Sequence, residues 1–75
     1  MRFSELKVGH RARITAFSGE KSLYRQRLIS LGLLPGTEFT VTRMAPLGDP
    51  IEIFVRGFAL SLRKDEADML TLEKL

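Results

Sequence analysis

The chain has 75 residues, with twelve basic and nine acidic side chains, a net charge of +3 and no cysteine. This length leaves room for a single domain, residues 1–75, whose thin core buries only about 60% of the surface of the unfolded chain. The absence of cysteine excludes disulfides and thiolate metal sites, and the single histidine, His10, makes no metal site alone. No apolar run approaches the roughly 20 residues of a membrane span.

Residues 11–17, RARITAF, alternate between apolar and polar side chains. This period of two predicts a half-buried strand whose inward row is Ala12, Ile14 and Ala16. The period then changes to a helical one. An apolar stripe at helical spacing predicts a helix over residues 23–31 that turns its other side to water, and its members are Tyr24, Leu28 and Leu31.

The stretch LGLLPG, residues 31–36, carries two stop signals in the most apolar part of the chain. Gly32 suits the left-handed position that ends a helix, with Leu33 folding back onto Leu28 in a Schellman arrangement. Residues 34–37 then have proline and glycine where a type II turn needs them. The first stop ends the helix, and the second directs the next strand.

The rest of the chain reads as strands and tight turns. Residues 37–45 form a strand with Phe39 and Val41 inward, APLGDP is a loop, and Gly57 makes the turn between strands 51–56 and 58–63. KDEAD is a polar turn or short helix, and residues 69–75 form the last strand. The inward rows of the two middle strands are Ile51, Ile53 and Val55, and Phe58, Leu60 and Leu62.

These elements predict a mostly β fold: a small, partly open barrel of about five strands with one helix inserted after the first strand. The expected core combines the inward residues of the strands with the helix stripe. It contains Ile14, Leu28, Phe39, Val41, Ile53, Leu60 and Leu62.

YRQRLISLGLLPG, followed by APLGDPIEI and then by Gly57 with LSLRKDEA, resembles the FeoA family at these spacings. The resemblance spans about Leu6 to Leu72 and implies an SH3-like barrel that serves bacterial ferrous-iron uptake. It also implies a partner, the membrane G-protein transporter FeoB, and a cytoplasmic adaptor held at the inner face of the membrane through that partner. No apolar h-region begins the chain, so we expect no signal peptide.

Apolar side chains that point away from the expected core are the candidates for a docking surface. They are flanked by charge, and Arg25 and Arg27 on the helix would form the rim. A covered second cluster is the competing explanation for each residue alone. The candidate anchors are Leu23, Ile29, Leu47 and Phe54.

The sequence offers no catalytic set, so we expect a binding protein rather than an enzyme, with no cofactor. The resemblance also implies stimulation of the partner's GTPase, for which Arg25 or Arg27 would insert in trans into the GTPase site. A solvated helix face is the simpler interpretation of these two arginines. We expect no tight Fe(II) or Zn(II) site, although transition-metal binding comes with the family. The one acidic cluster, expected to be solvated, is Asp65, Glu66 and Asp68.

Nucleic-acid binding is the alternative function. SH3-like barrels occur in ribosomal and transcription proteins, and this chain is basic. Against it, the positive charges form no single stripe and few aromatic platforms lie among them.

Overall fold

The computed structural model describes residues 2–19 and 22–75. Its elements in chain order are η1 (Phe3–Glu5), β1 (Arg11–Phe17), α1 (Ser22–Ser30), β2 (Glu38–Met44), β3 (Ile51–Val55), β4 (Phe58–Leu62), α2 (Lys64–Ala67) and β5 (Leu70–Lys74). The predicted helix agrees with α1 to within one residue at each end, and KDEAD is a short helix.

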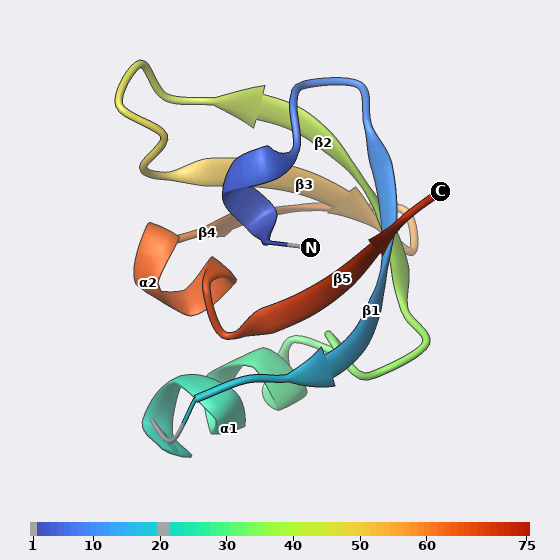
Figure 1. Cartoon of the computed structure of the whole chain (residues 1–75), viewed down its shortest axis with the longest axis vertical. Helices are drawn as coiled ribbons and strands as arrows, with labels where there is room; N and C mark the ends of the chain where they lie inside the picture. The colour runs from blue at the N-terminus through green and yellow to red at the C-terminus, as the bar shows by residue number, and fades with distance from the viewer. Residues whose placement is uncertain (1, 20–21) are drawn as a thin grey trace.

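The five strands form one antiparallel sheet in the order β4-β3-β2-β1-β5. Figure 1 shows that this sheet curves strongly, with α1 at one end of the molecule and the β2–β3 loop at the other. The two outer strands, β4 and β5, are not paired with each other. The predicted architecture, a partly open five-stranded barrel with a helix after its first strand, is confirmed.

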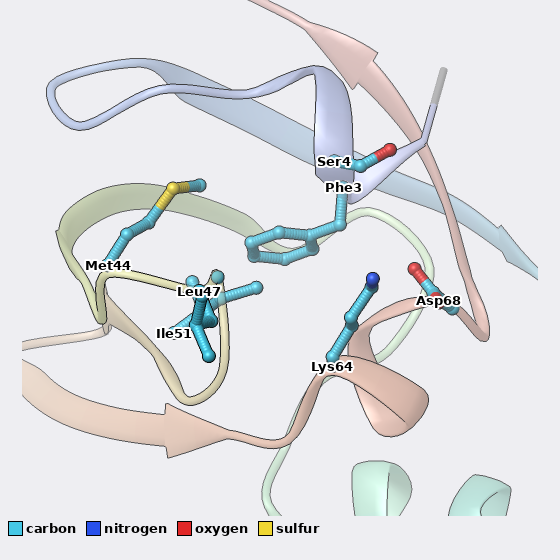
Figure 2. Close-up of a pocket in the computed structure, with 8 residues that line it drawn as sticks. Phe3, Ser4, Met44, Leu47, Ile51, Lys64 and Asp68 are labelled. Atoms are coloured by element: carbon cyan, nitrogen blue, oxygen red, sulfur yellow. The ribbon is translucent and has the colours of Figure 1, made fainter.

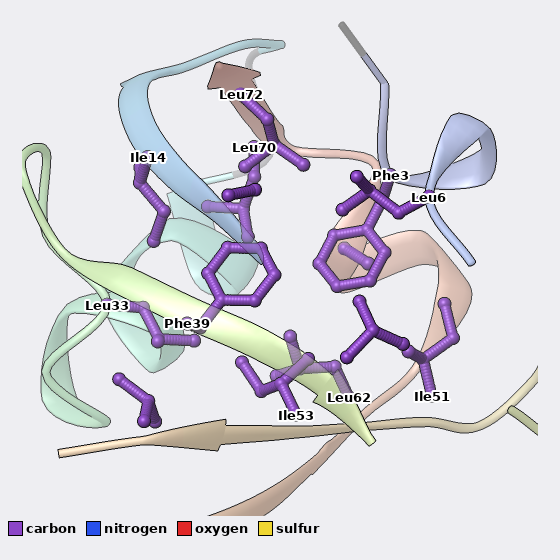
Figure 3. Packing of buried hydrophobic residues seen from close by; sticks show 14 of the residues in the cluster. Phe3, Leu6, Ile14, Leu33, Phe39, Ile51, Ile53, Leu62, Leu70 and Leu72 are labelled. Carbon is purple, nitrogen blue, oxygen red and sulfur yellow. The ribbon is translucent and has the colours of Figure 1, made fainter. Parts of the chain in front are cut away.

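The core fills the concave side of the sheet (Figure 3). At its centre the rings of Phe3 and Phe39 stack, with centroids 5.3 Å apart and planes 5° apart. Phe3 belongs to η1, an element that the sequence did not predict, and Leu6 just after it is also buried. All the predicted core residues are buried except Leu60, which is only partly buried. The N-terminal segment is therefore a structural part of the barrel.

The prediction that Ala16 faces inward is wrong. Ile14 pairs with Leu72 but Ala16 pairs with Thr71, so β1 has one extra residue relative to β5 at this point. A bulge of this kind reverses the alternation beyond it. Ala16 is consequently exposed, and Phe17 packs against the core in its place.

The prediction that Phe58 faces the interior is also wrong, because 69% of this residue is exposed. β4 begins at the tip of the β3–β4 hairpin, where Arg56 and Gly57 both have positive φ, of 50° and 85°. This is the two-residue turn expected from Gly57. The core does not extend to the tip, so burial increases along the row of alternate residues Phe58, Leu60 and Leu62.

The LGLLPG junction has the predicted geometry. The amides of Gly32 and Leu33 donate to the carbonyls of Ile29 and Leu28, at 2.9 Å each, which is the hydrogen-bond pair of a Schellman motif. Gly32 has φ of +83° and Gly36 of +95°, and the Thr37 amide closes the type II turn onto the Leu34 carbonyl at 3.0 Å.

Buried Thr37 ties this junction together through its hydroxyl. The Oγ1 atom donates to the Gly32 carbonyl at 3.3 Å and accepts from the Leu34 amide at 3.3 Å. It also accepts from the Arg56 guanidinium at 3.4 Å. The end of α1 is thereby linked to the β3–β4 hairpin.

Candidate functional site

The four predicted anchors are exposed, as expected. Leu47 and Leu23 are 91% and 79% exposed, and Ile29 and Phe54 are about half exposed. They do not form one surface. Leu47 lies in the β2–β3 loop, at the opposite end of the molecule from α1, and Phe54 lies on the outer face of the sheet opposite Thr40 and Ala59.

Leu23 and Ile29 share α1 but sit on different flanks of it. Six residues separate them, which places them about 120° apart around the helix axis. The flank of Leu23 also carries Arg27 and faces α2, whereas the flank of Ile29 also carries Arg25 and faces β1. The buried stripe through Leu28 runs between the two flanks on the core side.

Arg27 does not simply face water, because its guanidinium pairs with the Glu66 carboxylate of α2. The Arg27 side chain is 57% exposed, but that of Glu66 is only 5% exposed. Glu66 Oε1 also accepts the Arg63 amide at 3.0 Å, which caps the start of α2. The expectation that the whole acidic cluster is solvated is therefore wrong for Glu66, which joins α2 to α1.

Arg25 lies over the ring of Phe17, with its guanidinium carbon 5.5 Å from the ring centroid. This cation–π contact attaches the other flank of α1 to β1. Both helix arginines thus have partners inside the chain. An arginine that inserts in trans into a GTPase site must leave such contacts, so the structure gives this role no support.

An apolar hollow lies beside Leu47 (Figure 2). Its volume is about 180 Å³, and Phe3 and Ile51 form its floor while Lys64 and Asp68 stand at its α2 side. Met44 reaches it because a second bulge, between Val41 and Arg43, turns the end of β2 inward. Leu47 is therefore an exposed apolar side chain next to an apolar hollow, as a docking anchor would be.

The outer face of the sheet carries paired charges. Arg11 Nη2 lies 2.9 Å from Glu38 Oε1, and Arg13 Nη2 lies 3.5 Å from Glu73 Oε1. These carboxylates offset the arginines that a nucleic-acid phosphate would need. The structure adds no observation in favour of the nucleic-acid alternative.

In the described part of the chain, no three side chains of the types His, Cys, Asp or Glu come together as a metal site would require. His10 Nδ1 accepts the Lys7 amide at 3.0 Å, so the one imidazole serves the turn before β1. No helix among the described residues is long and apolar enough to cross a membrane.

The comparisons with known proteins decide the family. The model of the FeoA domain matches residues 1–74. This chain belongs to the FeoA family. A curated relative, the Fe(2+) transport protein A/Fe(2+) transporter FeoB fusion protein of Porphyromonas gingivalis, is 34% identical over 73 residues. That match covers 97% of this chain but only 8% of the relative, so the chain corresponds to a small part of the fused protein.

Solved FeoA structures have the same fold. The FeoA protein of Chlorobium tepidum is 45% identical, with a TM-score of 0.84, over all of this chain and 70% of its own. The FeoA of Stenotrophomonas maltophilia, a zinc complex described as an SH3 domain protein, is 25% identical with a TM-score of 0.81, over 97% and 89% of the two chains. The SH3-like fold implied by the resemblance is confirmed, and the names of these relatives associate their family with Fe(2+) transport.

Sequence reasoning missed the Glu66–Arg27 pair and the exposure of Phe58. Phe58 is part of a second apolar hollow, of about 200 Å³, between the hairpin and the end of α1. Its other lining residues are Leu31, Val55, Arg56 and Leu60. The position of Phe58 directly after a turn glycine was the one signal that could have indicated a residue beyond the core.

Proposed function

We propose that this chain is an accessory protein of ferrous-iron uptake that binds the cytoplasmic side of a FeoB-like G-protein transporter and supports its assembly or activity. The observation that carries this proposal is the fused relative, in which a FeoA region and FeoB share one chain. Fusion raises the effective concentration of one module for the other, which favours modules that work in contact. The chain reaches the inner face of the membrane through this partner.

The docking surface that we propose is centred on the exposed side of α1. Leu23 and Ile29 are its anchors, and Arg25 and Arg27 form its rim. Of the four predicted anchors, these two share one helix, whereas Leu47 lies in the β2–β3 loop at the other end of the molecule and Phe54 lies in β3 on the outer face of the sheet. A few buried apolar anchors dominate the binding energy of such interfaces, while rim charges set rate and orientation.

The test is capture of the detergent-solubilised FeoB-like transporter by the tagged chain. Leu23→Glu and Ile29→Glu should each weaken capture by about 2 kcal/mol or more, the cost expected for an anchor. Leu47→Glu and Phe54→Glu should weaken it less. Val8→Glu, at an exposed apolar position between η1 and β1, is the matched control for added charge outside α1, and melting curves show that each variant is folded.

Failure of the unchanged chain to capture the transporter would contradict the proposed function. Capture that is insensitive to both helix variants but lost with Leu47→Glu or Phe54→Glu would move the docking surface away from α1 without removing the partner.

A further inference from the structure

The outer edge of β4 has unpaired main-chain groups. Val55 and Phe58 close the two-residue hairpin, so Phe58, Leu60 and Leu62 direct their amides and carbonyls toward β3. The amides and carbonyls of Ala59 and Ser61 therefore point the other way. Within the described residues, none of these four groups has a hydrogen-bond partner.

The opposite edge of the sheet differs, because η1 contacts β5. β4 has no proline, and the side chains of Ala59 and Ser61 carry no charge. It therefore has neither the proline nor the charged side chains that usually protect an edge strand from pairing, and only its short length of five residues limits such pairing. An edge of this kind accepts another strand.

Two hollows follow β4 along the same edge. The hollow of about 200 Å³ beside Phe58 and Leu60 is mostly apolar and ends at Arg56. The other, of about 350 Å³, lies where β4 ends, and its lining residues are Arg27, Pro50, Ser61, Leu62, Arg63 and Glu66. A strand added to β4 would place alternate side chains toward these two hollows.

The charges at this edge are positive at both ends of the strand. Arg56 precedes β4 and Arg63 follows it, and neither guanidinium forms an ion pair with a carboxylate among the described residues. The carboxylate of Glu66 is already engaged by Arg27 and by the Arg63 amide. An incoming segment with an acidic side chain fits this edge, and a basic one does not.

We propose that the β4 edge binds an extended segment of the transporter as an added antiparallel strand. The segment has the order acidic–x–apolar. Its acidic residue, opposite Leu62, lies beside Arg63, and its apolar residue, opposite Leu60, enters the hollow beside Phe58. The main-chain groups of Ala59 and Ser61 supply the hydrogen bonds. This inference rests on the proposed function and adds the kind of segment that the transporter contributes.

The first test compares Ser61→Pro with Ser61→Thr in capture of the detergent-solubilised transporter. Proline removes the outward amide of Ser61 and leaves the bonds to β3, a position where edge strands accept it. We expect Ser61→Pro to weaken capture at least tenfold and Ser61→Thr less than twofold. Arg63→Glu should also weaken capture tenfold, whereas Arg43→Glu, at an exposed position of β2, is the matched charge control.

The second test uses a synthetic peptide, Thr-Glu-Thr-Leu-Thr-Val-Thr, added to the labelled chain and followed by NMR. The amide signals of Ala59 and Ser61 should shift. A methyl group on the amide nitrogen of the threonine after Glu should abolish the shift, because that amide would donate to β4. A methyl group on the amide nitrogen of Leu, which points away from β4, should leave it.

The outcomes separate the inference from the proposed function. Equal capture by folded Ser61→Pro and the unchanged chain overturns the inference and leaves the proposed function standing. No capture by the unchanged chain overturns both. If Ser61→Pro does not fold, the two methylated peptides decide, and equal binding of both overturns the inference. Self-association that Ser61→Pro abolishes, with capture unchanged, would assign the edge to a second copy of the chain and overturn it too.

Discussion

Replacing Arg27 by alanine should destabilise this protein far more than replacing Arg25, its neighbour on the same helix. Arg27 pairs with the nearly buried carboxylate of Glu66, and this pair joins α1 to α2. In Arg27→Ala the carboxylate stays buried but retains only the Arg63 amide as a donor. Arg25→Ala loses a cation–π contact with Phe17 instead.

The magnitude follows from the exposure of the two partners. Breaking a fully buried ion pair from one side costs about 3–5 kcal/mol. Here Arg27 is 57% exposed, and water can partly replace its guanidinium, so we expect a cost of about 2 kcal/mol, within the range for an under-satisfied buried acceptor. An exposed cation–π contact is worth only about 0.5–1 kcal/mol.

Thermal melting measures the difference. For a domain of this size, about 2 kcal/mol corresponds to a fall in Tm of roughly 8–16 °C. A double-mutant cycle with Glu66→Gln, which keeps the cap on the Arg63 amide, isolates the pair itself. If Arg27→Ala melts no lower than Arg25→Ala, or if the coupling energy is below about 0.5 kcal/mol, the assignment of Arg27 and Glu66 as the link between the helices is wrong.

Three further predictions concern stability and metal binding. Gly32→Val and Gly36→Val should each cost more than about 1 kcal/mol, because a β-branched residue resists positive φ; unchanged melting of both would contradict our account of the junction. Phe3→Ala should cost about 3–5 kcal/mol, against less than about 0.5 kcal/mol for Phe58→Ala, and equal melting of the two would show that η1 is not part of the core. Calorimetric titration with Fe(II) or Zn(II) should show no stoichiometric micromolar site, and a site lost in Asp65→Asn or Asp68→Asn would prove this expectation wrong.

The pattern of apolar and polar residues along the sequence was enough to predict the architecture. Period-two alternation that is interrupted once by a helical period is compatible with few folds in a chain of this length. The turn chemistry at Gly32 and Gly36 was equally local and was predicted correctly. The errors arose where neighbours in space decide. The bulge opposite Leu72 that exposes Ala16 depends on the pairing of β1 with β5, which local alternation does not encode.

The candidate site was less predictable for the same reason. Exposure of Leu23 and Leu47 could be read from patterns, because each lies off a recognisable apolar row. Their separation onto different surfaces could not, because it depends on where the sheet places α1 and the β2–β3 loop. The partner of Arg27 is 39 residues away in the chain, since it pairs with Glu66, and no local pattern indicates it.

The junction at LGLLPG and the β4 edge belong to one mechanical unit. Thr37 holds the Gly32 carbonyl at the end of α1 and accepts from Arg56 at the hairpin tip, so a shift of the hairpin disturbs the helix end directly. At the other end of β4, Glu66 connects the Arg63 amide to Arg27 of α1. The helix proposed to dock and the strand edge proposed to pair are thus fixed to each other at both ends of β4. A partner that uses both meets a preorganised surface, and little of its binding energy is lost in ordering it.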